Sequence, residues 1–225
     1  MATQEPTTMR TEGVAALADR VLTAPERGSG YFFPTAAGGT AVWVIGFAFS
    51  LALLSLANAE WINLTALGII VPVAYAVGAL GMIIGSLWEF RANNLFGAVA
   101  GVGYGAFWLS LALLLQFFAG GIVEATGAAG FADAVGAYQL LWALFTVCLL
   151  VAAWFVGRTV FVVFALLVAV FVLLALSNFS APGDTADALR KFGGYVGLVD
   201  AAVAWYVFTV LVVNTTAGRN VLPLK

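Results

Sequence analysis

The chain contains no histidine and a single cysteine, and these two absences exclude several kinds of chemistry. Without imidazole there is no histidine-ligated metal or haem and no histidine acid–base site. Cys148 has no partner for an intramolecular disulfide, and we expect it to be a small, buried apolar side chain. Carboxylates are scattered, and no glycine-rich phosphate loop follows a strand. These features do not favour an enzyme, a metal site or a cofactor, which leaves a permeation pathway or an assembly subunit.

Charged residues are also scarce, at 9% of the 225 residues, whereas 63% are hydrophobic. This composition is not that of a soluble domain. A membrane-spanning helix needs roughly 20 mainly apolar residues. Six stretches are long enough, at about 36–57, 64–88, 95–119, 136–156, 159–178 and 194–213. Because backbone groups in lipid must be satisfied internally and the alternation of a barrel is absent, we predict an all-α integral membrane protein with six transmembrane helices within residues 34–225.

A polar segment, residues 1–33, precedes the first predicted span. It lacks the apolar core of a signal peptide, so we expect it to stay on the protein in the cytoplasm. Several of its apolar residues share one helical face, and Pro25 would end that helix; they are Val14, Leu17, Ala18, Val21 and Leu22. The pattern is typical of a short amphipathic helix on the membrane surface. A tail with only nascent helix fits the same residues.

The positions of the nine Lys and Arg residues predict the orientation, because cytoplasmic segments gather positive charge. With the N-terminus inside, seven of them are cytoplasmic: Arg10, Arg20, Arg27, Arg91, Arg158, Arg219 and Lys225. Only Arg190 and Lys191 fall outside. We therefore predict a multi-pass protein of the cell (plasma) membrane with both termini in the cytoplasm, in contact with lipid and with no nucleic-acid partner.

Three charged residues lie close to or within the predicted spans. Glu89 and Arg91 are at the cytoplasmic junction of the second and third spans, where a solvated ion pair is the simplest expectation. Asp200 is about seven residues into the last span, where an ionised carboxylate costs about 2.5 to 3.5 kcal/mol. It must be protonated, paired or hydrated. A protonatable site facing a cavity and a carboxyl hydrogen-bonded to a neighbouring helix or subunit both remain open.

Glycines recur every fourth residue in the third span, at Gly97, Gly101 and Gly105. Such a stripe lets another helix approach closely. Tyr104 and Trp108 each follow one of these glycines by seven residues, so both aromatic rings project near the same face. The stripe predicts close packing of a helix or subunit and does not identify a function.

The run "WEFRANNLFGAVAGVGYGAFWLSLA", residues 88–112, closely resembles the signature of the acetate uptake transporters, also called succinate-acetate permeases. The matching residues are Glu89, Asn94, Phe96, Gly97, Tyr104, Gly105, Phe107, Trp108 and Leu109. The resemblance continues through "GAYQLLWALFT", "GGYVGL" and "GRNVLPL" and covers nearly all of the chain after residue 33. It departs from the family at "FPTAAGG", residues 33–39, at Met82 and at Asp200.

The resemblance implies a homo-hexamer in which each six-helix protomer carries a pathway for acetate and sometimes succinate. It places Tyr104 and Leu167 at an apolar constriction, with Val42 where better-known members carry a phenylalanine. The sequence also predicts that a carboxylate would be bound only weakly, because no Lys or Arg lies well inside a predicted span. A carboxylate would need the Tyr104 hydroxyl, helix N-terminal amides, or polar side chains such as Asn94, Asn178 and Trp108. Asn94 is equally a helix N-cap candidate.

Two functions of different classes follow. The first is a carrier or channel for acetate and related short-chain carboxylates, including succinate, either channel-like or coupled to protons. The second is a non-transporting membrane subunit or an acetate sensor, in which the aromatic cluster only packs the bundle. A channel for another small solute, such as urea or an amide, rests on architecture alone.

Overall fold

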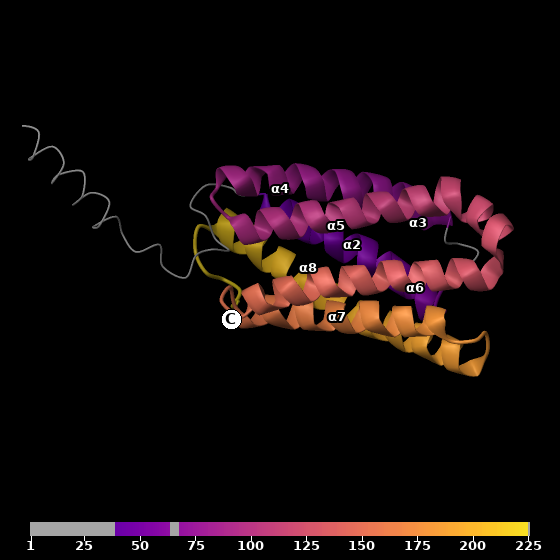
Figure 1. Cartoon of the computed structure of the whole chain (residues 1–225). Coiled ribbons are helices and arrows are strands. Elements are labelled where there is room, and N and C mark those ends of the chain that lie inside the picture. Colours follow the sequence, from indigo (N-terminus) through magenta and orange to yellow (C-terminus); the bar gives the residue numbers. More distant parts are fainter. Residues whose placement is uncertain (1–38, 64–67, 225) are drawn as a thin grey trace, which may run out of the picture. The chain divides into compact units, whose positions relative to one another are not determined.

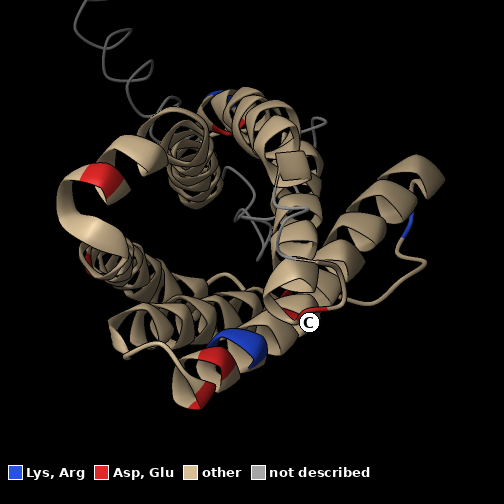
Figure 2. Ribbon diagram, turned by 90° about the vertical axis from the view of Figure 1, so that its right-hand side faces the viewer, with Lys and Arg blue, Asp and Glu red and all other residues tan. Residues whose placement is uncertain are grey.

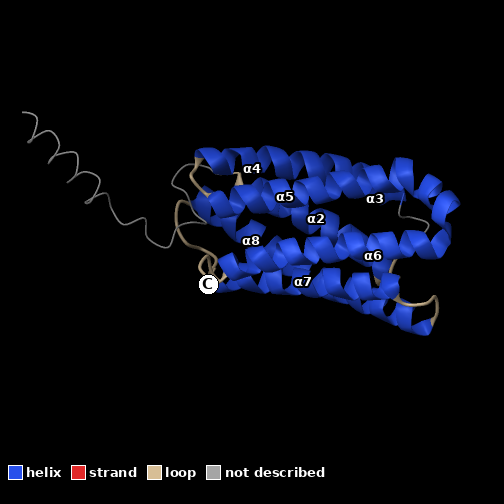
Figure 3. Cartoon of the chain, viewed as in Figure 1, coloured by secondary structure: helices blue, strands red, loops and turns tan. Residues whose placement is uncertain are grey.

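The computed structural model of the protein describes residues 39–63 and 68–224. All regular elements among these residues are helical (Figure 3), which confirms the all-α class. The expected amphipathic helix, and with it the whole 1–33 segment, lies outside the described residues. Most of "FPTAAGG" lies outside them as well.

The described residues contain five helices that are long and apolar enough to cross a membrane. The first is α2, and the second joins α3, the π-helical segment η2 and α4. The third is a 59-residue helix, Leu95–Ala153, and α7 and α8 follow it. The element bounds are α2 Thr40–Asn58, α3 Ile70–Val73, η2 Ala74–Gly81, α4 Met82–Arg91, α5 Leu95–Leu113, η3 Leu114–Phe118, α6 Ala119–Ala153, α7 Arg158–Phe179 and α8 Asp184–Ala217.

The 59-residue helix covers both the third and the fourth predicted spans. Residues 120–135, which lie between the third and fourth predicted spans, are helical on both sides of Gly127, and five of them are alanine, the strongest helix former. The helix is interrupted at Gly127, whose φ of 75° lies in the left-handed region that favours glycine. The chain reverses direction around this point (Figure 1).

The helix α8 begins at Asp184, ten residues before the predicted start of the last span at residue 194. Its first turn contains Asp184 and Asp187, whose negative charges interact favourably with the N-terminal end of the helix dipole. Hydropathy alone missed these polar turns. It also misplaced Cys148, which is exposed on the surface of the bundle and not buried.

The helices pack in a chain of neighbours around the bundle. α2 contacts α4 on one side and α8 on the other, α8 contacts α7, and α7 contacts α6. On the remaining side α4 and η2 pack against α5, whereas α5 and α6 touch each other only sparsely. Viewed along the helices, these elements surround a common centre, and charged residues are few (Figure 2).

The glycine stripe of α5 lies against α4 and η2. A side chain at Gly101 would meet Ser86 and the Trp43 ring, and one at Gly105 would meet Ile83. The stripe therefore brings the backbones of α5 and α4 together, as its spacing predicts. This contact fixes the side of α5 from which Tyr104 and Trp108 project.

Candidate functional site

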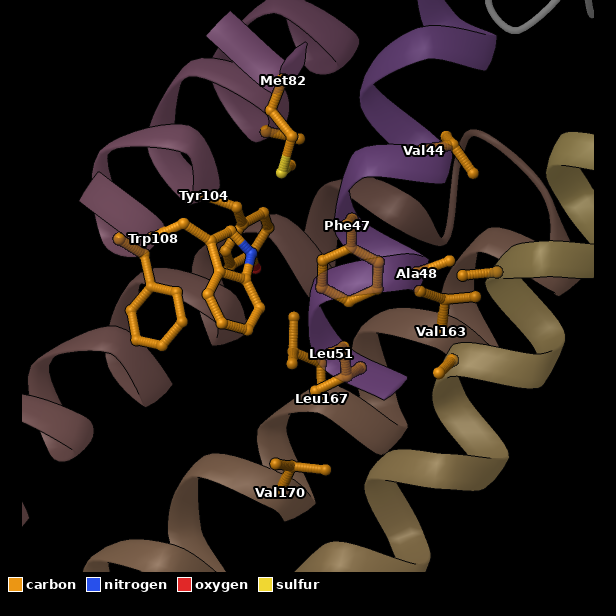
Figure 4. Close-up of a cluster of buried hydrophobic side chains, with 14 of the residues drawn as sticks. Val44, Phe47, Ala48, Leu51, Met82, Tyr104, Trp108, Val163, Leu167 and Val170 are labelled. Atoms are coloured by element: carbon orange, nitrogen blue, oxygen red, sulfur yellow. The ribbon is translucent and has the colours of Figure 1, made fainter. Parts of the chain in front are cut away.

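Two cavities lie inside the bundle, and three side chains line both of them: Phe47 from α2, Tyr104 from α5 and Leu167 from α7. The larger cavity has a volume of about 260 Å³ and the smaller one about 20 Å³. The three side chains point toward one another from their helices (Figure 4). The two cavities adjoin at these three side chains, which are called the constriction below.

The smaller cavity is apolar and tight. Besides the constriction, its lining residues are Trp43, Val44, Val160, Val163, Phe164, Ala204 and Val207. A cavity of about 20 Å³ is only slightly larger than the minimum that holds one water molecule, and a water there needs polar partners. In this structure the passage beyond the constriction is therefore closed to a hydrated solute.

Tyr104 is 2% exposed and is enclosed by aromatic rings. Its ring centroid lies 5.7 Å from that of Phe47, and the centroids of Phe145, Phe164 and Trp142 lie at 5.6, 6.1 and 6.5 Å. Its hydroxyl donates to Thr146 Oγ1 at 3.0 Å, and Thr146 in turn donates to the Trp142 carbonyl at 2.7 Å. The hydroxyl is thus tied to α6, and the ring is what Tyr104 presents to the cavities.

Val42, predicted for the constriction, lies on α2 close to Phe47, which lines both cavities. Val42 is 48% exposed and lines neither cavity. Trp43, Phe47 and Leu51 are buried at intervals of four residues along α2, so they share the inward face of that helix. Val42 is one residue away from Trp43, a rotation of about 100° about the helix axis, and this turns it outward.

Polar groups gather at the end of the larger cavity that lies away from the constriction. They are Asn58, Tyr138, Gln139, Ser177, Asn178 and Arg190. Asn178, predicted as a polar pathway residue, lines this cavity. Its Nδ2 donates to Gln139 Oε1 at 3.0 Å and to the Leu174 carbonyl at 2.8 Å.

Arg190 is held at this end by a cluster of charges. It donates to the Asn58 carbonyl at 3.1 Å, to Glu60 at 2.7 Å and to Asp187 at 3.0 Å, and Lys191 pairs with Glu60 at 2.7 Å. Hydrogen bonds from Lys191 and then Arg190 lower the pKa of the Glu60 carboxyl below its usual value. The guanidinium is therefore oriented and largely neutralised by fixed acids.

Trp108 also lines the larger cavity and is 1% exposed. Its indole Nε1 is buried and has no hydrogen-bond partner. Indole nitrogen is a donor only, and a buried donor normally has an acceptor. Trp108 therefore leaves an unused donor at the wall of the larger cavity.

Glu89, Asn94 and Thr40 form a buried cluster at the opposite end of the bundle from Arg190. Glu89 is 0% exposed, and its two carboxylate oxygens accept hydrogen bonds from Thr40 Oγ1, at 2.7 Å, and from Asn94 Nδ2. Asn94 Oδ1 also caps α5 by accepting from the Gly97 amide at 3.1 Å. Arg91 is exposed, so the expected solvated pair with Glu89 is replaced by a buried tie between α2, α4 and α5. Neither Glu89 nor Asn94 lines a cavity.

Asp200 is the remaining predicted residue, and it lies on the inner face of α8. It is 0% exposed, and neither carboxylate oxygen has a hydrogen-bond partner. It lines neither cavity, although Ala204, one turn further along α8, lines the smaller one.

Comparison with known proteins identifies the family. The sequence matches the GPR1/FUN34/yaaH family over residues 31–223. The chain belongs to this family. This assignment confirms the resemblance to acetate uptake transporters that the 88–112 run indicated.

Several relatives of this chain are named as transporters. The succinate-acetate/proton symporter SatP of Escherichia coli strain K12 is 32% identical over 80% of this chain and 91% of its own length. Ammonia transport outward protein 2 of Saccharomyces cerevisiae is 35% identical over 72% of this chain and 56% of its own. The solved structure titled "Structure of the bacterial acetate channel SatP" is 31% identical, with a TM-score of 0.75 over 85% of this chain and 100% of that one. The chain is thus a multi-pass membrane protein with the fold of that channel.

The family signature explains which site residues the sequence could identify. Tyr104 and Trp108 belong to the signature run and line the larger cavity. Phe47, Tyr138 and Arg190 were not predicted for the site. Phe47 was detectable from its spacing with Trp43 and Leu51, and Tyr138 lies within the run "GAYQLLWALFT". Arg190 carries no local signal, because it reaches the cavity only through packing between helices.

Proposed function

We propose that this protein transports acetate and related short-chain carboxylates across the plasma membrane through a pathway inside each protomer. The pathway runs from the larger cavity, past Phe47, Tyr104 and Leu167, into the smaller cavity. The observation that carries the proposal is that these three side chains line both cavities. The names of the E. coli relative and of the solved channel support acetate and succinate as solutes.

The walls of the larger cavity suit a small anion that is bound weakly. The Trp108 indole supplies an unused donor, whereas the Tyr138 hydroxyl and the Asn178 amide already donate within the protein. Among the described lining residues the only cation is Arg190, which fixed acids already engage. A solute that is held weakly can leave again, which conduction requires. The apolar constriction then acts as a gate by excluding water.

We further propose six membrane crossings with both termini in the cytoplasm. The helix Leu95–Ala153 has 59 residues, which at about 1.5 Å per residue is far longer than a hydrocarbon core of about 30 Å, so it accounts for two crossings that meet at Gly127. In this orientation the Arg190 end of the larger cavity faces outward. A homo-hexamer fits the many exposed apolar side chains, which require lipid or neighbouring copies of the chain.

The test is solute uptake into proteoliposomes containing the purified oligomer. Radiolabelled acetate and succinate are added, and empty vesicles correct for acetic acid that crosses the lipid unaided. We expect saturable uptake of acetate that unlabelled succinate competes away. Ammonium is measured in parallel, because the name of the yeast relative makes it the rival solute.

The Leu167→Ala variant links that uptake to the constriction. Shortening Leu167 widens the passage between the cavities and should raise the acetate rate and weaken discrimination against larger carboxylates. Leu141→Ala is the matched control, since Leu141 is 69% exposed on α6 and lines neither cavity. Uptake no faster than in empty vesicles, from a correctly assembled oligomer, would exclude transport and favour the sensor or subunit. Equal rates for both variants would remove Leu167 from the gate.

A further inference from the structure

Asp200 is a buried carboxyl group with no use in the pathway described so far. Both of its oxygens lack a hydrogen-bond partner, and the residue is fully buried in the middle of α8. Removing an ionised carboxylate from water costs several kcal/mol unless it is paired and hydrogen-bonded. A protonated carboxyl avoids that cost.

Asp200 lies on a helix that packs beside the constriction. α8 packs against α2 and α7, which supply Phe47 and Leu167. One turn before Asp200, Gly197 lies against Ser55 and Val170, and one turn after it, Ala204 lines the smaller cavity. Asp200 is therefore at the level where the pathway changes from the larger cavity to the smaller one.

No cation faces Asp200 from the helices around it. α2 contains no ionisable residue, and the only one in α7 is Arg158, at its first position. On α8 itself, Arg190 and Lys191 are roughly 15 Å away along the helix and are paired with Glu60. The tyrosines of α8, Tyr195 and Tyr206, are exposed, and Tyr104 from α5 is uncharged at neutral pH. Among the residues that the structure describes, nothing near the carboxyl would compensate a negative charge.

We propose that Asp200 is the proton-binding site that couples carboxylate transport to proton movement. This inference rests on the proposed function. Asp200 holds a proton while the constriction is closed. When a carboxylate reaches the constriction, the Asp200 O–H donates to a carboxylate oxygen and the proton moves to the solute, so that the neutral acid crosses the apolar passage.

The proton balance closes with one proton per carboxylate. The solute loses its proton to water on the far side, and the Asp200 carboxylate regains one from water that enters the larger cavity. For a monocarboxylate such as acetate, the net result is one proton and one carboxylate moved in the same direction without net charge. Because an ionised Asp200 has no partner, the empty protein returns to the protonated form before the next cycle.

The test uses the full-length protein in sealed liposomes with a trapped pH dye and radiolabelled succinate. Uptake is measured with an inward proton gradient, and exchange is measured without one. Asp200→Asn keeps the shape of the side chain but cannot release a proton, and Asp133→Asn, at an exposed acid on α6, is the matched control. We expect wild type and Asp133→Asn to accelerate under the gradient and to acidify the lumen. Asp200→Asn should lose both responses, and its exchange should slow as well, because the carboxylate must then cross the apolar constriction with its charge.

The outcomes separate this inference from the proposed function. Exchange in the wild type without any response to the gradient, or a full gradient response in Asp200→Asn, would refute the coupling role and leave transport intact. Absence of exchange in the wild type would refute transport itself.

A second measurement does not depend on activity. Infrared spectra of the wild type at neutral pH should show the C=O stretch of a protonated carboxylic acid, and Asp200→Asn and Asp200→Ala should each lack that band. Its absence from the wild type would overturn the inference, even if one variant failed to fold.

Discussion

Gly101 offers a direct test of how the bundle positions its aromatic residues. A Cβ at this position of α5 would overlap Ser86 Oγ and press against Ser86 Cβ and the Trp43 ring. Neither neighbour moves away easily, because Ser86 Oγ donates to the Met82 carbonyl at 2.7 Å and Trp43 is buried between helices. The Gly101→Ala variant should therefore push α5 away from α4.

The expected magnitude follows from two opposing contributions. Overpacking of a tight contact costs about 1 to 3 kcal/mol. Replacing glycine by alanine within a helix returns roughly 1 kcal/mol. The variant should lose between about 0 and 2 kcal/mol of unfolding free energy. Gly120→Ala on α6 is the matched control, because nothing lies within 4 Å of its added Cβ, and this variant should gain roughly 1 kcal/mol.

The assay is unfolding of each purified variant in detergent, followed by tryptophan fluorescence. The difference between Gly120→Ala and Gly101→Ala isolates the packing contribution, since the gain in helix propensity is common to both. Adding Ser86→Ala to Gly101→Ala removes the overlapping oxygen and should recover part of the loss. If Gly101→Ala proves as stable as Gly120→Ala, the close contact between α5 and α4 is not what holds the helices in place.

Three further predictions address other contacts. Glu89→Ala leaves the Thr40 and Asn94 donors unpartnered, so it should lose about 2 to 6 kcal/mol of unfolding free energy, whereas Glu89→Gln keeps an acceptor and should lose less. Tyr104→Phe removes only the bond to Thr146 and should cost about 0.5 to 1.5 kcal/mol with acetate flux unchanged, whereas Tyr104→Ala should raise flux. Because the Glu60 pKa is lowered on folding, its ion cluster stabilises the protein above the ordinary value of 4.5 and loses this effect as the pH falls through the lowered pKa. The melting temperatures of wild type and Glu60→Gln should therefore differ at neutral pH and converge in acid.

Hydropathy predicted the helices well wherever lipid-compatible length was the deciding property. The predicted span 159–178 lies within α7, and the prediction for the first span differs from α2 mainly at its start. Hydropathy did not predict the helices at residues 120–135 and at the start of α8, where the chain is helical but not strongly apolar. Helix propensity and the charge preference of the helix dipole decide those segments, and an apolar window detects neither.

Some residues of the candidate site could be predicted from the sequence and others could not. Tyr104 and Trp108 were identifiable because they lie within a motif whose spacing is fixed by one helix. Phe47 lies on the buried face of α2, whereas the predicted Val42 lies on its exposed face. Glu89 and Arg91 are two residues apart and looked like a surface pair, yet the carboxylate turns inward to Thr40 and Asn94. Contacts between distant segments decided each of these cases.

The distribution of polar groups also says where a permeating carboxylate would meet its barrier. Hydrogen-bond donors line the larger cavity, whereas the smaller cavity is lined by apolar and aromatic side chains. On the proposed pathway, an anion that passes Phe47 and Leu167 leaves its donors behind before it regains water. An unpaired charge is costly in such surroundings, and a neutral acid is much less so. A proton supplied at the level of Asp200 would lower the barrier at the one step where the walls of the pathway offer no other compensation.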